Sequence, residues 1–136
     1  MKHRRALVSL LMLGTMATAS SWAAETTEQV VKRHMAAFAK KDLEGTIADY
    51  ADNAVLITPT ATTKGKKAIH DLFAQLLGGP NPPSVNVTHD VYEGNIGYLV
   101  WTQDAGKPTE VRGSDTFAVQ NGKIVSQTVA MVPKNQ

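Results

Sequence analysis

Core-facing side chains recur at the spacing of an α-helix near the start of the sequence. The segment from Thr27 to Lys40 predicts a helix with one contiguous core-facing arc, made of Val30, Val31, His34, Met35, Ala37 and Phe38. Thr26 and Gln29 have the spacing of a capping box, in which each side chain accepts a hydrogen bond from the other residue's backbone amide. We therefore expect this helix to begin directly after Thr26.

Two more helices are expected before the middle of the chain. Asp42 is a good N-cap for a short helix, whose inward positions are Leu43, Ile47 and Tyr50. A longer helix should cover residues 66–77, because its apolar residues follow the i, i+3, i+4, i+7 pattern: Ile69, Leu72, Phe73 and Leu76. Gly78 is its expected C-cap, since glycine readily adopts the conformation that ends helices.

The rest of the sequence predicts strands. Residues 54–58 should form a strand that Pro59 ends, because proline lacks the amide donor of a sheet ladder. Beyond Pro83, apolar and polar residues alternate with a period of two, which predicts strands around 85–91 and over 96–103, 109–120 and 123–132. Val85, Val87, His89 and Val91 should share one face of the first of these, and Asn121-Gly122 predicts a hairpin between the last two. Helices followed by an antiparallel meander indicate an α+β fold with the helices on one side of the sheet.

The first residues are typical of a secretory leader. Residues 1–5 are basic, residues 6–19 are apolar, and Ser21-Trp22-Ala23 offers the small-x-small pattern that signal peptidase accepts. The apolar run is shorter than the roughly 20 residues that span a bilayer. We therefore expect residues 1–23 to be a cleaved signal peptide and residues 24–136 to form a single domain, periplasmic or secreted and free of the membrane after cleavage. An uncleaved membrane anchor is the alternative.

Composition narrows the possible functions. Without residues 1–23, three of the fourteen basic residues are lost, so eleven Lys and Arg stand against twelve Asp and Glu, a net charge of −1. No basic stripe for nucleic acid remains. The chain has no cysteine, so packing alone must stabilise the exported fold. Scattered histidines without helical i, i+4 pairing give no metal signature, and no phosphate-binding glycine loop is present, so no metal or other cofactor is expected.

The run from Tyr50 to Pro59, reading Tyr-Ala-Asp-Asn-Ala-Val-Leu-Ile-Thr-Pro, carries a family resemblance. Two short helices precede it, and Gly65-Lys66-Lys67-Ala68-Ile69 opens the next helix before the strands. This order resembles the SnoaL-like proteins and the ketosteroid isomerases of the nuclear transport factor 2-like superfamily over essentially all of the chain after the leader. The resemblance implies a cone-shaped roll, in which a strongly curved, mixed but mainly antiparallel sheet packs against three N-terminal helices around a conical pocket.

The resemblance also assigns three polar positions. The isomerases use an aspartate before the strand-ending proline as general base, and that position is Thr58 here. Their oxyanion hole needs a tyrosine on the first helix and a protonated aspartate on a late strand, and these positions are His34 and Asp115. A threonine hydroxyl is not basic enough to take a proton from carbon near neutral pH. Ketosteroid isomerase chemistry is therefore not expected.

Two of these residues are candidate site residues even without the resemblance. His34 lies within the apolar arc of the first helix, where a polar ring must find a partner. Asp115 shares its strand face with Val111, Gly113, Phe117 and Val119, where a carboxyl is costly unless it is paired, hydrogen-bonded or protonated. If both point into one cavity, they could form a catalytic acid–base pair with coupled titration. The alternative is that each is a satisfied core group.

Further residues are expected to contact a ligand. Tyr50, Tyr98 and Trp101 would supply aromatic walls, and His89 could line a cavity or cap a strand edge. The expected substrate-binding set is Tyr50, Thr58, His89, Tyr98, Trp101 and Phe117. Aromatic residues on strands also serve as plain core, so that interpretation stays open.

Two functions are consistent with the sequence. In the first, the pocket binds a small, apolar, oxygen-bearing molecule, with Asp115 and His34 as acid and base if the protein isomerises, cyclises or dehydrates it. In the second, the protein is a non-catalytic dimeric binding or assembly module with a vestigial pocket. The resemblance implies a homodimer that pairs through the open face of the sheet.

Overall fold

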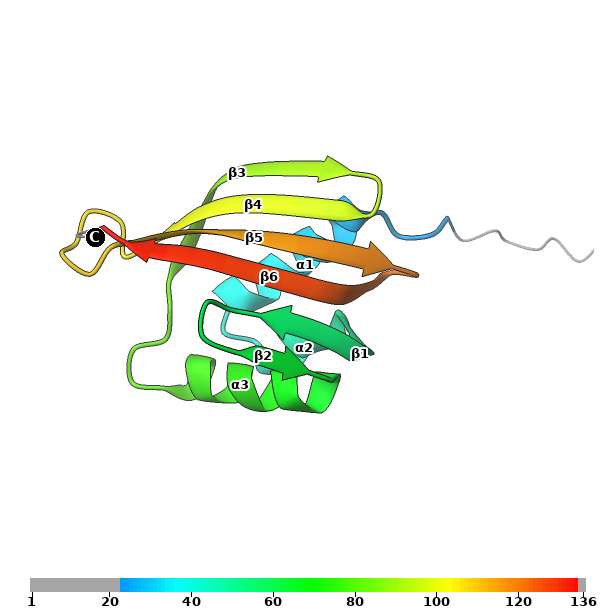
Figure 1. Cartoon of the computed structure of the whole chain (residues 1–136), viewed down its shortest axis with the longest axis horizontal. Helices are drawn as coiled ribbons and strands as arrows, with labels where there is room; N and C mark the ends of the chain where they lie inside the picture. The colour runs from blue at the N-terminus through cyan, green and yellow to red at the C-terminus, as the bar shows by residue number, and fades with distance from the viewer. Residues whose placement is uncertain (1–22, 135–136) are drawn as a thin grey trace, which may run out of the picture.

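A computed structural model of the chain describes residues 23–134, so the predicted leader lies outside it except for its last residue. Figure 1 shows the elements, which follow the order α1 (Thr27–Ala39), α2 (Leu43–Ala48), β1 (Tyr50–Ile57), β2 (Thr62–Lys64), α3 (Lys66–Gly78), β3 (Val85–Glu93), β4 (Ile96–Gln103), β5 (Val111–Gln120) and β6 (Lys123–Pro133). The α+β prediction is confirmed. Within the described part of the chain, no helix is long and apolar enough to cross a membrane.

The two N-terminal helices start at the predicted caps. Thr26 and Gln29 form the capping box, each accepting from the other's backbone amide at 3.2 and 2.9 Å. The Asp42 carboxylate accepts from the Gly45 amide at 2.9 Å and caps α2. A Cβ on Gly45 would lie 2.3 Å from that carboxylate, so glycine is needed for the cap to form.

The strands form one mixed sheet. Its six strands have the order β2-β1-β6-β5-β4-β3, and all neighbours are antiparallel except β1 and β6, which are parallel. The Asn121-Gly122 hairpin joins β5 to β6 as predicted, with positive φ angles of 50° and 70°. The sheet is open and curved, which confirms the expected cone-like roll.

The helices pack on one side of this sheet; in Figure 1, α1 and α2 lie behind the strands and α3 lies along the β2 edge. Helix α1 packs on β3 to β6, while α3 packs on β1, β2 and α2. The core lies between the layers and consists of Val30, Val31, Phe38, Ile47, Tyr50, Ala54, Leu56, Ile69, Phe73, Leu77, Leu99, Trp101, Phe117, Val119 and Ile124.

Two local predictions were wrong, and one short strand was missed. Tyr50 does not face the core from α2, because that helix ends at Ala48 and Tyr50 begins β1. The short strand β2 was not predicted, since three residues are too few for an alternation pattern. Gly79 rather than Gly78 is the C-cap of α3, and its φ of −69° is not the left-handed conformation.

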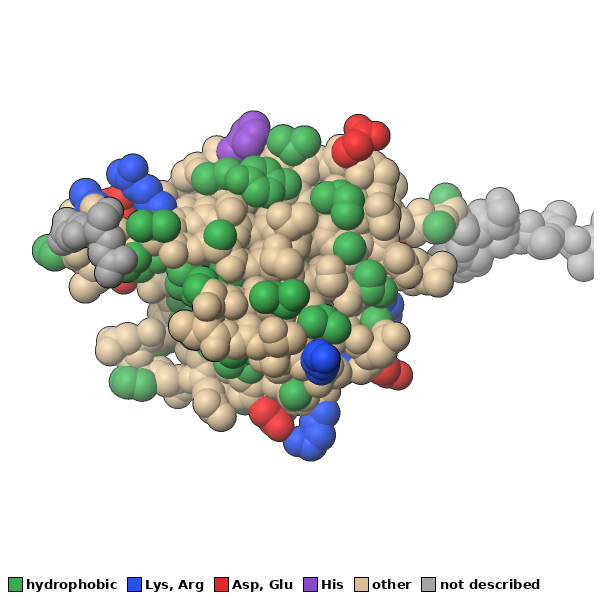
Figure 2. All heavy atoms as spheres, in the orientation of Figure 1, with side chains coloured by type: hydrophobic (Ala, Val, Ile, Leu, Met, Phe, Trp, Pro, Cys, Tyr) green, Lys and Arg blue, Asp and Glu red, His purple; other side chains and the backbone are tan. Residues whose placement is uncertain are grey.

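The other face of the sheet carries no helix. Large hydrophobic side chains lie on it that are between 40% and 55% exposed: Ile57, Val91, Ile96, Tyr98 and Val132. Figure 2 shows hydrophobic side chains spread over this side of the molecule. We refer to these five residues as the outer sheet patch.

Candidate functional site

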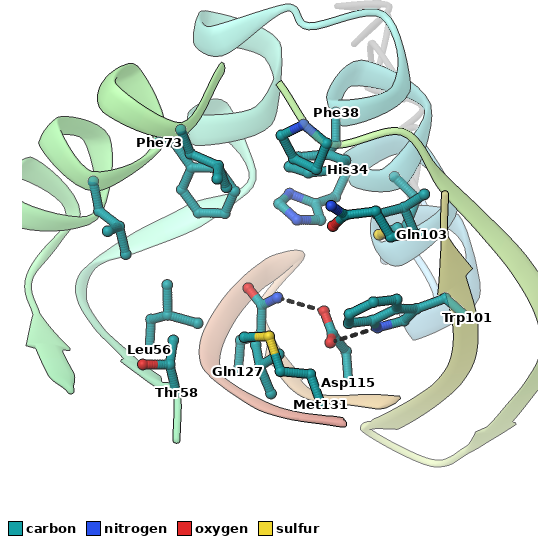
Figure 3. A pocket seen from close by; sticks show the side chains of 16 residues that line it. His34, Phe38, Leu56, Thr58, Phe73, Trp101, Gln103, Asp115, Gln127 and Met131 are labelled. Carbon is teal, nitrogen blue, oxygen red and sulfur yellow. Dashed lines mark hydrogen bonds between the residues drawn. The ribbon is translucent and has the colours of Figure 1, made fainter. Parts of the chain in front are cut away.

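A pocket of about 300 Å³ opens between α1, α3 and the inner face of the sheet. Most of its walls are apolar, and the helices contribute Met35, Phe38, Leu72, Phe73 and Leu76. Figure 3 shows His34 and the phenylalanines on the helix side, with Trp101, Asp115 and Gln127 across the cavity on the sheet side. The polar groups are therefore few and converge on one apolar hollow, which is the usual form of a small-molecule site.

Asp115 reaches this pocket because it lies on the inner face of β5. In the antiparallel register it stands between Leu99 of β4 and Val129 of β6, which also face inward. The residue is only 7% exposed. Burial raises the pKa of the carboxyl, and hydrogen bonds from Trp101 and Gln127 partly oppose that rise.

A short chain of hydrogen bonds fixes the Asp115 carboxyl. Trp101 Nε1 donates to Oδ1 at 2.9 Å, and Gln127 Nε2 donates to Oδ2 at 2.7 Å (Figure 3). The Tyr50 hydroxyl donates to Gln127 Oε1 and so keeps the amide nitrogen turned toward the carboxyl. Both carboxyl oxygens thus accept from uncharged donors, and Tyr50 acts on Asp115 through the amide.

Gly113 allows Trp101 to reach this carboxyl. The two residues are paired in register on β5 and β4, and the indole lies across the glycine. A Cβ on Gly113 would lie 2.2 Å from a ring carbon of Trp101 and 2.7 Å from the Ala130 carbonyl oxygen. Any side chain here would displace the indole that donates to Asp115.

His34 presents an uncharged ring to the pocket. Its Nδ1 lies 3.1 Å from the Thr46 carbonyl oxygen, which can only accept, so Nδ1 carries the proton. Burial lowers the pKa of the ring to about 4, against smaller opposing effects of the Thr46 carbonyl and the Asp49 carboxylate. Nε2 has no hydrogen-bond partner among the described residues, and we call it open in that sense; because the buried ring forms part of the pocket wall, this nitrogen is the one that can accept from a ligand.

His34 and Asp115 line the same pocket, as expected, but neither owes its pKa shift to the other. The imidazole is neutral near neutral pH and acts as a hydrogen-bond acceptor. Asp115 is the acidic side chain of the pocket wall. Their arrangement is that of two separately tuned groups.

Two other predicted ligand contacts also line the pocket, and two lie just behind it. Trp101 and Thr58 are in the wall. The Thr58 hydroxyl, however, contacts the Ala61 amide at 3.2 Å and the Ala61 carbonyl at 3.3 Å, in the turn after β1. Tyr50 and Phe117 are buried and pack edge-on against His34, with ring centroids 5.3 and 5.6 Å away. They support the site without lining it.

His89 and Tyr98 were wrongly predicted to line the cavity, because both are exposed on the outer face of the sheet. Trp101 and Tyr98 are an odd number of residues apart on β4, so they point to opposite faces. On β3, a bulge between Val87 and His89 shifts the alternation by one residue. As a result His89 pairs with outward-facing Val100 and leaves the face that Val85 occupies.

Gln127 is the main site residue that the sequence analysis missed. Its signal was available, since it lies two residues before Val129 and four before Met131, both on the inner face of β6. Its buried side chain, 4% exposed, links Tyr50 to Asp115. Gln103 at the end of β4 was missed too. Among residues 23–134, no group of three or more His, Asp or Glu side chains is placed to hold a metal ion.

Comparison with known proteins finds the same fold. Residues 31–127 match the family described as the SnoaL-like domain. A nuclear transport factor 2-like protein of unknown function from Mesorhizobium loti has a TM-score of 0.71 at 20% identity, over 80% of this chain and 93% of that one. Another from Cytophaga hutchinsonii has a TM-score of 0.69 at 18% identity, over 81% and 93%. A Shewanella denitrificans protein whose name proposes a SnoaL-like polyketide cyclase has a TM-score of 0.66 at 16% identity, over 78% and 90%. The predicted superfamily is confirmed. At these sequence identities, the similarity to the solved structures supports the fold alone.

Proposed function

The chain belongs to the SnoaL-like domain family, and from this premise we propose that it is an exported protein whose pocket binds a small, largely apolar molecule bearing an oxygen. The observation that carries the proposal is the pocket itself, an apolar hollow of about 300 Å³ that contains the open Nε2 of His34 and the carboxyl of Asp115. A ligand hydroxyl would donate to Nε2, while its hydrocarbon body replaces water along the helix side.

A catalytic form of this proposal assigns proton transfer to Asp115. Burial raises the pKa of this carboxyl, which makes it a stronger proton acceptor than an ordinary aspartate. Neutral His34 would hold the ligand oxygen by accepting its proton in a hydrogen bond. Isomerisation, cyclisation and dehydration all need such a transfer, and the cyclase named for the Shewanella protein is in line with this class. Ketosteroid isomerisation is not proposed, because Thr58 stands at the position of the base and its hydroxyl is engaged in a turn.

Ligand binding is tested by thermal unfolding with a panel of steroid ketones and terpenoid alcohols. A ligand that binds only the folded protein at about 100 times its Kd stabilises it by about 2.7 kcal/mol. Leu72→Trp, at the partly exposed edge of the pocket, should abolish the shift, whereas His89→Ala, outside the pocket, should leave it intact. A shift that survives Leu72→Trp would place binding elsewhere. For catalysis, Asp115→Asn should abolish turnover.

Export is proposed from the leader-like first 23 residues. Protein recovered from the periplasm or the medium should have an N-terminal sequence that begins at Ala24 or within a few residues of it. Recovery of the intact chain from the membrane fraction would instead indicate an uncleaved anchor.

The second candidate function is a dimeric module, and the outer sheet patch favours it. These exposed apolar side chains lie on the helix-free face, where a second copy of the chain would cover them. Light scattering after size exclusion should give the mass of a dimer for the wild type and of a monomer for Tyr98→Glu. A dimer that persists in this variant would exclude the outer sheet patch as its interface.

A further inference from the structure

Asp115 differs from the other buried carboxylates of residues 23–134. Asp49 is buried and accepts from Arg33 Nη2 at 2.6 Å and Nε at 2.8 Å. Glu110 is buried and accepts from Arg112 at 3.0 Å and Lys134 at 3.3 Å. Asp115 accepts only from an indole and an amide, both uncharged. It is also the one of the three that lines the pocket.

The pocket offers no cation to Asp115 within the described part of the chain. Neither lysine nor arginine lines it, and His34, the one basic side chain in its wall, is neutral near neutral pH. Buried charges in proteins are normally paired, because uncharged donors replace only part of the solvation that water provides. A cation that enters the pocket would supply the charged partner that the described residues do not give Asp115.

The surroundings of Asp115 also suit a positive charge. The Trp101 indole lies beside the carboxyl, and the edge-to-face pair of Phe38 and Phe73, with centroids 5.9 Å apart, lines the opposite wall (Figure 3). The faces of aromatic rings attract cations within about 6 Å. The open Nε2 of His34 adds a second acceptor for an N–H group.

We propose that the ligand of this pocket carries a basic amine, whose ammonium group binds the Asp115 carboxylate while its apolar body lies against the helix side. The proposal rests on the proposed ligand-binding function and adds an amine to the ligand described there. A neutral alcohol of the same shape would satisfy the acceptors but leave the charge of Asp115 uncompensated. A carboxylate would bring a second negative charge into an apolar space.

Three matched probes test this directly: cyclohexylmethylamine, cyclohexylmethanol and cyclohexanecarboxylate, titrated into the purified protein by calorimetry near neutral pH. The amine should bind at least about tenfold more tightly than the alcohol, a difference of about 1.4 kcal/mol. The carboxylate should bind more weakly than both. Asp115→Asn should bring the affinities for the amine and the alcohol within about threefold of each other. His89→Ala should leave the ranking of the three probes unchanged.

Each outcome supports or overturns the amine proposal. An alcohol or carboxylate that binds the wild type as tightly as the amine would overturn the amine proposal and leave the pocket function standing. Amine preference that persists in Asp115→Asn would also overturn it, since the carboxylate would not be its source. Absence of binding by all three probes would count against both proposals. The wild-type ranking alone is decisive if Asp115→Asn fails to fold, which its thermal melt would show.

Discussion

Gly113→Ala should destabilise the protein and release Trp101 from Asp115. The added Cβ would lie 2.2 and 2.5 Å from two ring carbons of Trp101 and 2.7 Å from the Ala130 carbonyl oxygen. The indole cannot stay in place against such contacts, and the carbonyl belongs to the neighbouring strand, so it cannot give way without disturbing the sheet. Moving the ring breaks the 2.9 Å bond from its nitrogen to Asp115 Oδ1.

The expected magnitude follows from these two effects. Overpacking a close-packed site costs about 1–3 kcal/mol. Losing a hydrogen bond to a buried carboxyl costs about 1.5–3 kcal/mol. Moving the ring relieves the overpacking but breaks the hydrogen bond, so the two costs are not fully additive. We therefore expect the free energy of unfolding to fall by about 3 kcal/mol, or Tm to fall by about 10 °C.

Urea unfolding followed by tryptophan fluorescence measures both parts. In a chain that starts at Ala24, Trp101 is the only tryptophan, so its emission reports directly on the displaced ring. Gly78→Ala is the matched control, because a Cβ at this helical position meets nothing within 4 Å and should be neutral or slightly stabilising. Wild-type stability and emission in Gly113→Ala would refute the reasoning.

Acid should destabilise the fold through His34. Its pKa is lowered from 6.5 to about 4, so between these values the unfolded chain binds a proton that the folded protein excludes. The unfolding free energy should therefore fall as pH drops through this window, by up to about 3 kcal/mol. His34→Gln should remove that part of the slope in urea titrations, and parallel slopes would contradict it. Gln127→Leu removes a donor that lowers the Asp115 pKa, so carbon-13 NMR should find this pKa higher still, and an unchanged value would contradict the hydrogen-bond chain. Arg33→Leu leaves the buried Asp49 carboxylate unpaired and should cost about 2 kcal/mol, less than for a fully enclosed pair because the guanidinium is half-exposed. Arg33→Lys should recover part of this, and a loss as large as that of Arg33→Leu would argue against the charge as its cause.

The features that could be predicted from the sequence are those that depend on residues close together in the chain. The capping box of Thr26 and Gln29 depends on residues three apart, and the structure contains it as expected. The Asn121-Gly122 turn depends on two residues that tolerate positive φ, which they adopt. Asp115 could be identified because a carboxyl among alternating apolar residues is conspicuous in one strand alone.

The features that escaped prediction depend on neighbours far away in sequence. The bulge in β3 moved His89 to the outer face, and nothing between Val87 and His89 marks it in a single strand. The role of Gln127 appears only when β5 and β6 are set in register and β1 brings Tyr50 beside them. The Gly113 contact likewise needs the register of β4 against β5. The residue pattern of a single strand indicates which face each side chain occupies, but not which residues of other strands it contacts.

The parallel pairing of β1 with β6 has a consequence for how the molecule is made. The earliest strand of the sheet finds its central neighbour only when the last one, Lys123–Pro133, has been synthesised. Until then β1, β2 and α3 cannot join the meander of β3 to β5, and the far wall of the cavity, which includes Val129 and Met131, does not exist. Folding should therefore remain at a loose, protease-sensitive stage until β6 is available and finish in one late, cooperative step. A chain that ends before β6 should therefore fail to fold rather than form a less stable version of the same structure.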